Sequence, residues 1–368
     1  MNEPIFIARQ DTLEQEILPA HWLAQYKLFG EESYTFQDKG IWKKLCMSSA
    51  AANDRDIHAE ALEEMLTTFS AEHTGKWMLL VYGMDAAVLE GLASMAAIAA
   101  NGTAMAAVAG NALLMHAIAN SETAMQAISR SQTAMQRIAN STTAMDAISG
   151  SRIARGAVQA SPYYNSCIKE NDMAIAKLAV ALANLESAGY SGMAGVAADS
   201  TAMTAVAASA TAMTAVAASS TAMTAVAASG VALKAIAQAY KNTANMLQFL
   251  KAVNASDTLI KRIYTTLTNA TALFGASQLG GQDGVESANS WATTSAAPNA
   301  FLACACGYYS SGASVNVTYN GTVIAQGKTG TSRPNSVTST SVNAITMAPS
   351  TFTENGDGYL AVQKFTAK

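Results

Sequence analysis

Hydrophobic residues recur every ten positions through much of this chain, in two columns that lie three residues apart. The first column is Met in most repeats, and the second is Ile or Val. A phrase that returns at a fixed period predicts a repeat architecture in which each unit packs on its neighbours. We expect both columns to form the packed interior of a shaft, with the packing residues Met125, Ile128, Met135, Ile138, Met203, Val206, Met213, Val216, Met223 and Val226.

The spacing within one repeat favours short helices. Met203, Val206 and Ala207 fall at i, i+3 and i+4, which is one face of an α-helix, and the many alanines favour helix formation. A continuous helix is not expected, because ten residues would rotate the apolar stripe by roughly 80° per repeat. Ser, Thr and Asn just before each Ala-Met are N-cap types. We therefore predict two-turn helices joined by tight corners, stacked as a solenoid or as layers shared between chains. A β-solenoid is the alternative, because the β-branched column also suits strands.

The repeats divide the first two thirds of the chain. Residues 1–90 have ordinary globular variety and predict a mainly helical attachment domain. The repeats form a first shaft block at 91–160 and a second at 191–240. Between them, 161–190 predicts a hinge at Pro162 followed by one longer helix.

The period changes from ten to seven after the second block. Over 241–275 the heptad positions Met246, Val253, Ile260, Leu267 and Phe274 predict a coiled-coil neck through which chains associate. A helix packed on its own chain is the alternative. Residues 285–368 are rich in Ser, Thr, Asn and Val, and Asn320-Gly321 between two apolar runs predicts a β-hairpin. The predicted fold is thus an elongated α+β multidomain chain that ends in an antiparallel β-sandwich.

Composition narrows the classes of function. The chain has 368 residues, of which 50% are hydrophobic and 13% charged, with a net charge of −4. It has no basic cluster interleaved with aromatic residues, so nucleic acid is not an expected partner. No unbroken apolar run reaches the length of a membrane span, and we expect no membrane insertion. The four cysteines are too few and too scattered for a disulfide scaffold, and we expect reduced core residues.

No catalytic motif stands out, and we expect no enzyme, metal or cofactor. Loops that are rich in Tyr, Ser, Asn and Gly and lie on a rigid β domain are instead typical of adaptable binding surfaces. Burial in the core is the alternative for the aromatic residues. The candidate receptor-binding residues are Trp291, Tyr308, Tyr309, Tyr319, Asn355 and Asp357.

The repeat phrase Thr-Ala-Met-x-Ala-Val/Ile-Ala-x-Ser, in close variants at 123–131, 133–141 and 201–209, resembles the decapeptide repeats of tail-fibre proteins from tailed bacteriophages. The resemblance implies a homotrimer in the virion tail, assembled in the host cytoplasm. It further implies an N-terminal domain that binds tail or baseplate proteins and a C-terminal tip that binds a bacterial surface glycan or protein. The alternatives are a surface-glycan depolymerase on a stalk and a purely architectural tail, baseplate or collar protein.

Overall fold

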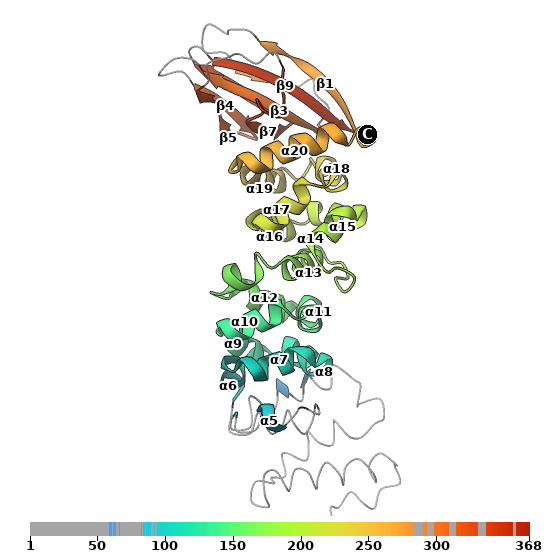
Figure 1. Cartoon of the computed structure of the whole chain (residues 1–368), viewed down its shortest axis with the longest axis vertical. Helices are drawn as coiled ribbons and strands as arrows, with labels where there is room; N and C mark the ends of the chain where they lie inside the picture. Colours follow the sequence, from blue (N-terminus) through green and yellow to red (C-terminus); the bar gives the residue numbers. More distant parts are fainter. Residues whose placement is uncertain are drawn as a thin grey trace, which may run out of the picture. The chain divides into compact units, whose positions relative to one another are not determined.

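The structure is a computed structural model, and it divides the chain into two compact units, Met1–Ala174 and Ile175–Lys368. Figure 1 labels the helices and strands of both units. Most of the predicted attachment domain, 1–90, lies outside the described residues. The structure describes residues 59–60, 62–63, 66, 82, 84, 86–89, 92, 94–282, 290–292, 298–308, 314–329, 336–355 and 358–368.

The decapeptide repeats of unit 1 are helices of six to nine residues, as their hydrophobic spacing predicts. The β-solenoid alternative is therefore wrong. The predicted hinge after Pro162 is a single π-helical turn, η4, and a longer helix, α13, follows it. The elements are α5 (Ala86–Leu89), α6 (Met95–Ala100), α7 (Gly102–Gly110), α8 (Ala112–Asn120), α9 (Glu122–Ser129), α10 (Gln132–Ala139), α11 (Thr142–Gly150), α12 (Arg152–Ala160), η4 (Tyr164–Ile168) and α13 (Asp172–Leu182).

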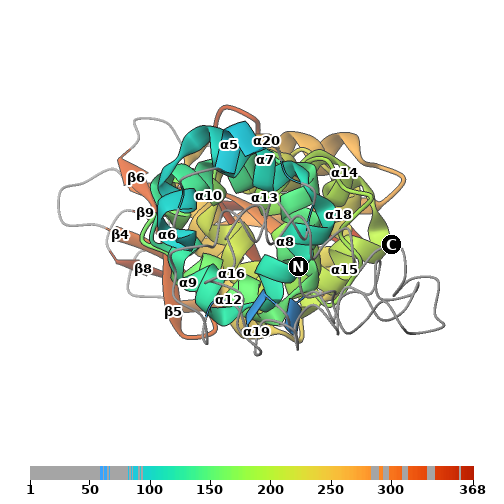
Figure 2. The same ribbon diagram turned by 90° about the horizontal axis from the view of Figure 1, so that it is seen from below.

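A corner residue turns the chain sharply between helices, and α7 and α8 meet at 100°. In the view from below, α6, α7 and α8 lie on three different sides (Figure 2). Each helix then packs on the third helix after it, α6 on α9, α7 on α10, α8 on α11 and α9 on α12. Because a new helix begins at every corner, the apolar stripe does not rotate around the stack, and both columns face the interior. All ten predicted packing residues are 0–1% exposed.

Five corner serines share one pair of hydrogen bonds, whereas Ser209 donates to the carbonyl of Leu182, only 27 residues earlier. The Ser131 hydroxyl accepts from the backbone N–H of Ala134, which caps α10, and donates to the carbonyl of Ala99 at 2.6 Å. The same donation, to a carbonyl 32 residues earlier, recurs in both units. These serine ladder bonds run from Ser131 to Ala99, from Ser141 to Ala109, from Ser151 to Ala119, from Ser161 to Ser129 and from Ser229 to Ala197.

Unit 2 begins within α13, at Ile175, and its helical part runs through the second block of repeats to two longer helices. Its helices are α14 (Met193–Ala198), α15 (Ser200–Ala208), α16 (Ala210–Ala218), α17 (Ser220–Ala227), α18 (Gly230–Gln238), α19 (Thr243–Asn254) and α20 (Asp257–Asn269). The pattern of contacts continues through α19 and α20, which pack on α16 and α17. There the longer side chain of Asn245 donates to the carbonyl of Ala207, and Thr266 donates to that of Ala227.

The prediction of a continuous coiled-coil neck over 241–275 is wrong. The helix breaks after Asn254, and Ser256 caps a new helix by accepting from the N–H of Leu259. Phe274 begins a strand rather than ending a helix. The heptad residues are buried within one chain, at 0–2% exposure: Met246, Val253, Ile260, Leu267 and Phe274. Because the helices and sheet of the same chain cover them, they do not form an open seam for partner chains.

The predicted antiparallel β structure is confirmed, and it starts at Phe274 rather than at 285. One sheet has the order β1-β9-β3-β6, with β7 also paired to β3, and the other has the order β2-β8-β4-β5. Neighbouring strands are antiparallel except for the short β3–β6 pair. The strands are β1 (Phe274–Gln282), β2 (Ser290–Ala292), β3 (Ala300–Tyr308), β4 (Ser314–Tyr319), β5 (Thr322–Gln326), β6 (Lys328–Thr329), β7 (Ala344–Met347), β8 (Ser350–Asn355) and β9 (Gly358–Ala367).

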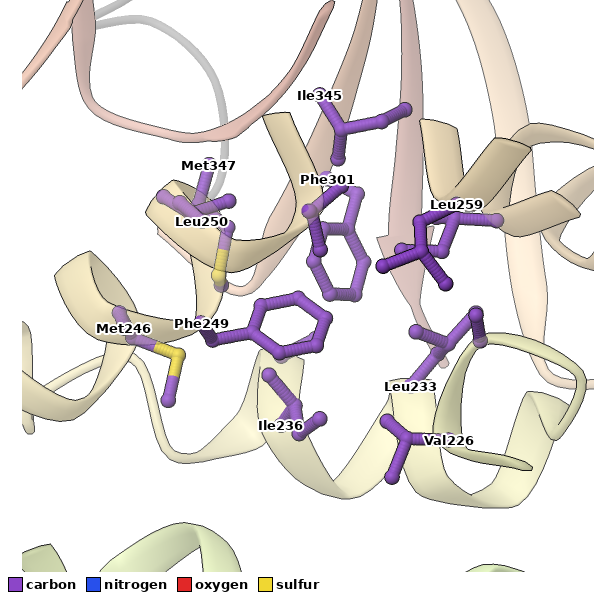
Figure 3. Close-up of a cluster of buried hydrophobic side chains, with 14 of the residues drawn as sticks. Val226, Leu233, Ile236, Met246, Phe249, Leu250, Leu259, Phe301, Ile345 and Met347 are labelled. Carbon is purple, nitrogen blue, oxygen red and sulfur yellow. The ribbon is translucent and has the colours of Figure 1, made fainter. Parts of the chain in front are cut away.

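Helices and strands of unit 2 share one hydrophobic core. Phe249 of α19 lies between Ile236 of α18 and Phe301 of β3 (Figure 3), and the two phenyl centroids are 6.2 Å apart. Strand β3 is buried along its length, where Phe249 of α19 contacts Phe301 and strand β4 of the four-stranded sheet packs against it. A hydrogen bond also links the helices to the C-terminal part of the unit, because the Tyr264 hydroxyl of α20 donates to the carbonyl of Val337. The four-stranded sheet packs on the other sheet through β4 and β8 and on α19 through β5, and its half-buried and exposed side chains lie on the face turned away from these contacts.

Candidate binding face of the outer sheet

Two rows of side chains run across the outer face of the four-stranded sheet. Thr318 of β4 lies opposite Val323 of β5 and Thr351 of β8. Directly opposite residues in antiparallel strands have their Cβ atoms about 5 Å apart, so each row is continuous. The second row is formed in the same way by Gln326, Asn316 and Thr353. We call these six residues the outer-sheet face.

Burial shows which way these side chains point. Along β4, Val315, Val317 and Tyr319 are 0–3% exposed, whereas the intervening Asn316 and Thr318 are half-buried. Successive side chains of a strand point to opposite sides of the sheet. The alternation therefore places the two apolar residues and the tyrosine inside, and the amide and hydroxyl groups outside. Val323, at 48% exposure, adds an apolar contact to this otherwise polar face.

A tight hairpin fixes the register of β4 and β5. Its two turn residues, Asn320 and Gly321, have φ of +46° and +73°. Asn and Gly adopt this left-handed conformation more readily than other residues, and its twist matches that of the flanking strands. The hairpin predicted from the Asn-Gly pair is confirmed, and it positions Val323 opposite Thr318.

Asn316 carries a hydrogen-bonding group without a partner. Its Oδ1 atom is buried and accepts no hydrogen bond within the described part of the chain. A buried acceptor without a donor costs about 1–3 kcal/mol of stability. Together with three threonines and one glutamine, Asn316 gives the outer-sheet face the neutral donors and acceptors that suit hydroxyl-rich or amide ligands.

The structure does not bring the six predicted receptor-binding residues together. Tyr319 points into the core at 3% exposure, and burial raises the pKa of its hydroxyl, so its assignment to an exposed surface is wrong. Trp291 and Asn355 lie in strands of the outer sheet, whereas Tyr308 ends a strand of the other sheet. Only the backbone of these three is described. Tyr309 and Asp357 lie outside the described residues.

The alternation of Val315-Asn316-Val317-Thr318-Tyr319 could have identified the outer-sheet face from the sequence. It groups Tyr319 with the two valines on the buried side, and it groups Asn316 with Thr318 on the other. Aromatic composition alone pointed instead to the tyrosine. The partners of the row in β5 and β8 come from strand pairing, which the local pattern does not contain.

The cysteines of β3 belong to the core, as predicted. Cys304 and Cys306 are fully buried thiols that form no disulfide, and desolvation raises the pKa of the Cys304 thiol well above its ordinary value. The thiolate is the reactive form, so burial keeps this thiol unreactive. Within the described ranges, no group of three His, Cys, Asp or Glu side chains is placed to hold a metal ion. No single described helix is long and apolar enough to cross a membrane.

Comparison of the chain with protein-family models and with curated proteins gives no match.

Proposed function

We propose that the chain is a structural component of a bacteriophage tail fibre, which spaces an N-terminal virion anchor from a C-terminal surface that binds the bacterial cell. The observation that carries the proposal is the serine ladder, with its constant step of 32 residues. A unit that makes the same bonds to its neighbour at every step can be repeated to set a length.

The packing of the repeats suits a mechanical role. Helices of six to nine residues are marginal alone, so each depends on its neighbours for stability. In most repeats the interior holds a Met or Leu and a β-branched residue, and at five corners a serine links a helix end to the preceding layer. Pulling one helix out of the stack would break both kinds of contact at once, and this coupling favours resistance to stretching.

The outer-sheet face is the surface that we assign to cell binding. Its neutral hydroxyl and amide groups support recognition of a surface glycan or a polar protein loop. The face is small, so one copy is expected to bind weakly. Several copies in one particle would raise the overall strength through avidity.

Binding of the purified chain to intact host bacteria tests this assignment. The double variant Thr318→Lys and Thr353→Lys places two charges on the outer-sheet face, and we expect it to lose binding at least tenfold. The control Thr204→Lys and Thr214→Lys adds the same charges to exposed positions of α15 and α16 and should bind like the parent. Equal binding by both double variants would remove the outer-sheet face from the proposal. Release of reducing ends from the host polysaccharide would instead favour the depolymerase on a stalk.

Light scattering of the purified chain tests the homotrimer. The predicted mass is three times the 38.1 kDa of one chain. Since the heptad residues serve the core of their own chain, such a trimer would form through other surfaces, and residues 1–90 would still provide the contact with tail or baseplate proteins. A monomer at micromolar concentration would overturn the trimeric fibre.

A further inference from the structure

A groove of about 760 Å³ lies on the side of unit 1, between α9 and α12. Met125 forms part of its base, and Ile153, Gly156 and Ala157 of α12 line one wall. Ile153 is 43% exposed and is one of two large hydrophobic residues exposed in the described chain. The volume is in the range of sites that hold a small molecule or a short peptide. We call it the α9–α12 groove.

The groove opens where α12 departs from the repeat. Gly156 stands at the place of Gln126 and Gln136 in the preceding repeats, and Ile153 stands at the place of a threonine. A Cβ on Gly156 would meet no atom within 4 Å, so packing does not require glycine there. Glycine inside a helix costs about 0.5–1 kcal/mol relative to alanine. The departures therefore lower helix stability and expose apolar surface, while together they hollow out one site.

The equivalent place between α7 and α10 is covered. There the Arg137 side chain lies against Gly102, with its Nη2 atom 3.3 Å from where a glycine Cβ would stand. Twenty residues later in the same pattern, Ala157 replaces the arginine, and Glu122 replaces the glycine. The small side chain of Ala157 leaves the space over α9 open. Alanine is the usual residue of this column, as at Ala127 and Ala147, and Arg137 is its exception, so the features that set α12 apart are Ile153 and Gly156.

Positive charge dominates the rim. Arg130 and Arg152 line the groove together with one acid, Glu122. Among the described residues, neither guanidinium forms an ion pair or a hydrogen bond. Arg155, also on α12, differs because it donates to the carbonyl of Ser149. Two uncommitted guanidinium groups beside an apolar wall are suited to a carboxylate carried next to an apolar side chain, since arginine binds carboxylates through paired hydrogen bonds.

We propose that the α9–α12 groove docks a segment of a partner protein in which acidic residues flank a large apolar side chain. The apolar side chain lies on Ile153 and Ala157, and the carboxylates bind Arg130 and Arg152. The site is distinct from the outer-sheet face, so the proposal stands apart from the cell-binding role. It gives the shaft a lateral contact of its own.

Two tetrapeptides test the chemistry against the full chain: acetyl-Glu-Leu-Glu-Phe-amide and its neutral counterpart acetyl-Gln-Leu-Gln-Phe-amide. Titration by calorimetry at low salt should show the acidic peptide binding about tenfold more tightly than the neutral one. Changing Arg130→Gln and Arg152→Gln together should remove this difference. Equal affinities of the two peptides for the parent chain would overturn the proposal.

Filling the groove tests its location. Gly156→Gln restores the residue of the other repeats and should abolish binding of both peptides. Its matched control is Gly150→Gln at the end of α11, where a Cβ also meets nothing within 4 Å and which does not line the groove. Ala157→Arg, which copies Arg137, is a second way to fill the groove if the first variant folds poorly. Unchanged peptide binding by a folded filled variant would overturn the site, and binding of polygalacturonate with neither peptide bound would assign it to an anionic glycan instead.

Discussion

The outward positions of the repeats differ between the two units, although the inward ones match. In α9 to α12 of unit 1 they carry Glu, Gln, Asp, Arg and Ile, whereas in α15 to α17 of unit 2 they carry Ser, Thr and Ala. Two outward threonines of unit 2 already bond within the unit: Thr204 donates to the carbonyl of Ser200, and the Thr214 hydroxyl bonds the carbonyl of Ala210 and Oε1 of Gln248. Unit 1 therefore presents groups that can bind a partner, and unit 2 presents a face that is closed on itself.

This difference separates two demands on one repeat. The buried columns and corner serines are set by packing, because every layer must fit the next. The outward positions are free of that constraint. They can hold small Ser, Thr and Ala side chains, as in unit 2, or charged and larger side chains that can bind a partner, as at the α9–α12 groove. Four experiments can break or sharpen this distinction.

The largest expected effect comes from the buried column. Met135→Ala in unit 1 and Met213→Ala in unit 2 each remove a side chain that is 0% exposed, and each should lower the free energy of unfolding by about 2–5 kcal/mol. Urea unfolding followed by circular dichroism measures both. The outward variant Thr204→Ala serves as the control and should change stability by no more than about 0.5 kcal/mol. A unit that tolerates its Met→Ala change as well as this control would not share the interior that we describe.

The corner serines should give the next largest effect. Ser151→Ala removes the cap of α12, worth about 1 kcal/mol, and leaves the carbonyl of Ala119 without its donor, at a further 1–3 kcal/mol or so. Ser229→Ala should cost a similar amount in unit 2, where the acceptor is Ala197. Ser94→Ala is the matched control, because among the described residues its hydroxyl makes only the cap to Ala97. If Ser94→Ala and Ser151→Ala lower the free energy of unfolding equally, the ladder bond adds no stability beyond that of the cap.

Sequence reasoning succeeded where the signal was local. The Met and β-branched columns, the Ser and Asn caps and the Asn320-Gly321 turn all act within a few residues, and each appears as predicted. The prediction of a coiled-coil neck was wrong because a heptad stripe shows that a helix face is apolar but does not show which chain covers that face. The signal that would have corrected it was Ser256 followed by Asp257, a cap residue and an acid that mark a helix start. The outer-sheet face was not predicted for a different reason: its rows join three strands, and the pairing of those strands depends on the whole fold.

Acid should affect the cap of α15 in unit 2 and spare the matching caps in unit 1. The N–H of Ala202 and the Tyr190 hydroxyl donate to the Asp199 carboxylate and hold its pKa below the ordinary 3.8. A lowered pKa in the folded state stabilises the fold above the unfolded value, and this contribution is lost as pH falls below 3.8. Asn101, which caps α7 through its amide, has no such titration.

Stability measured by urea unfolding across this acid range tests the contribution of Asp199. Asp199→Asn keeps a cap residue and should flatten the part of the pH dependence that Asp199 supplies. Asn101→Asp is the reverse variant and should introduce the same loss of stability at low pH in unit 1. If Asp199→Asn retains the full acid sensitivity of the parent, other carboxylates are responsible for it.

The smallest expected effect concerns the glycine of the α9–α12 groove. Gly156→Ala should raise the free energy of unfolding by about 0.5–1 kcal/mol, because alanine restricts the unfolded chain and its Cβ meets no atom within 4 Å in the fold. Gly110→Ala, at the last residue of α7 and equally free of contacts, should gain less, since helix ends hold their residues less firmly. The methyl group is small enough to leave the groove open, so the acidic peptide should still bind. A more stable chain with unchanged binding would show that this outward position limits stability without contributing packing, whereas a loss of stability would show that α12 needs glycine for its own fold.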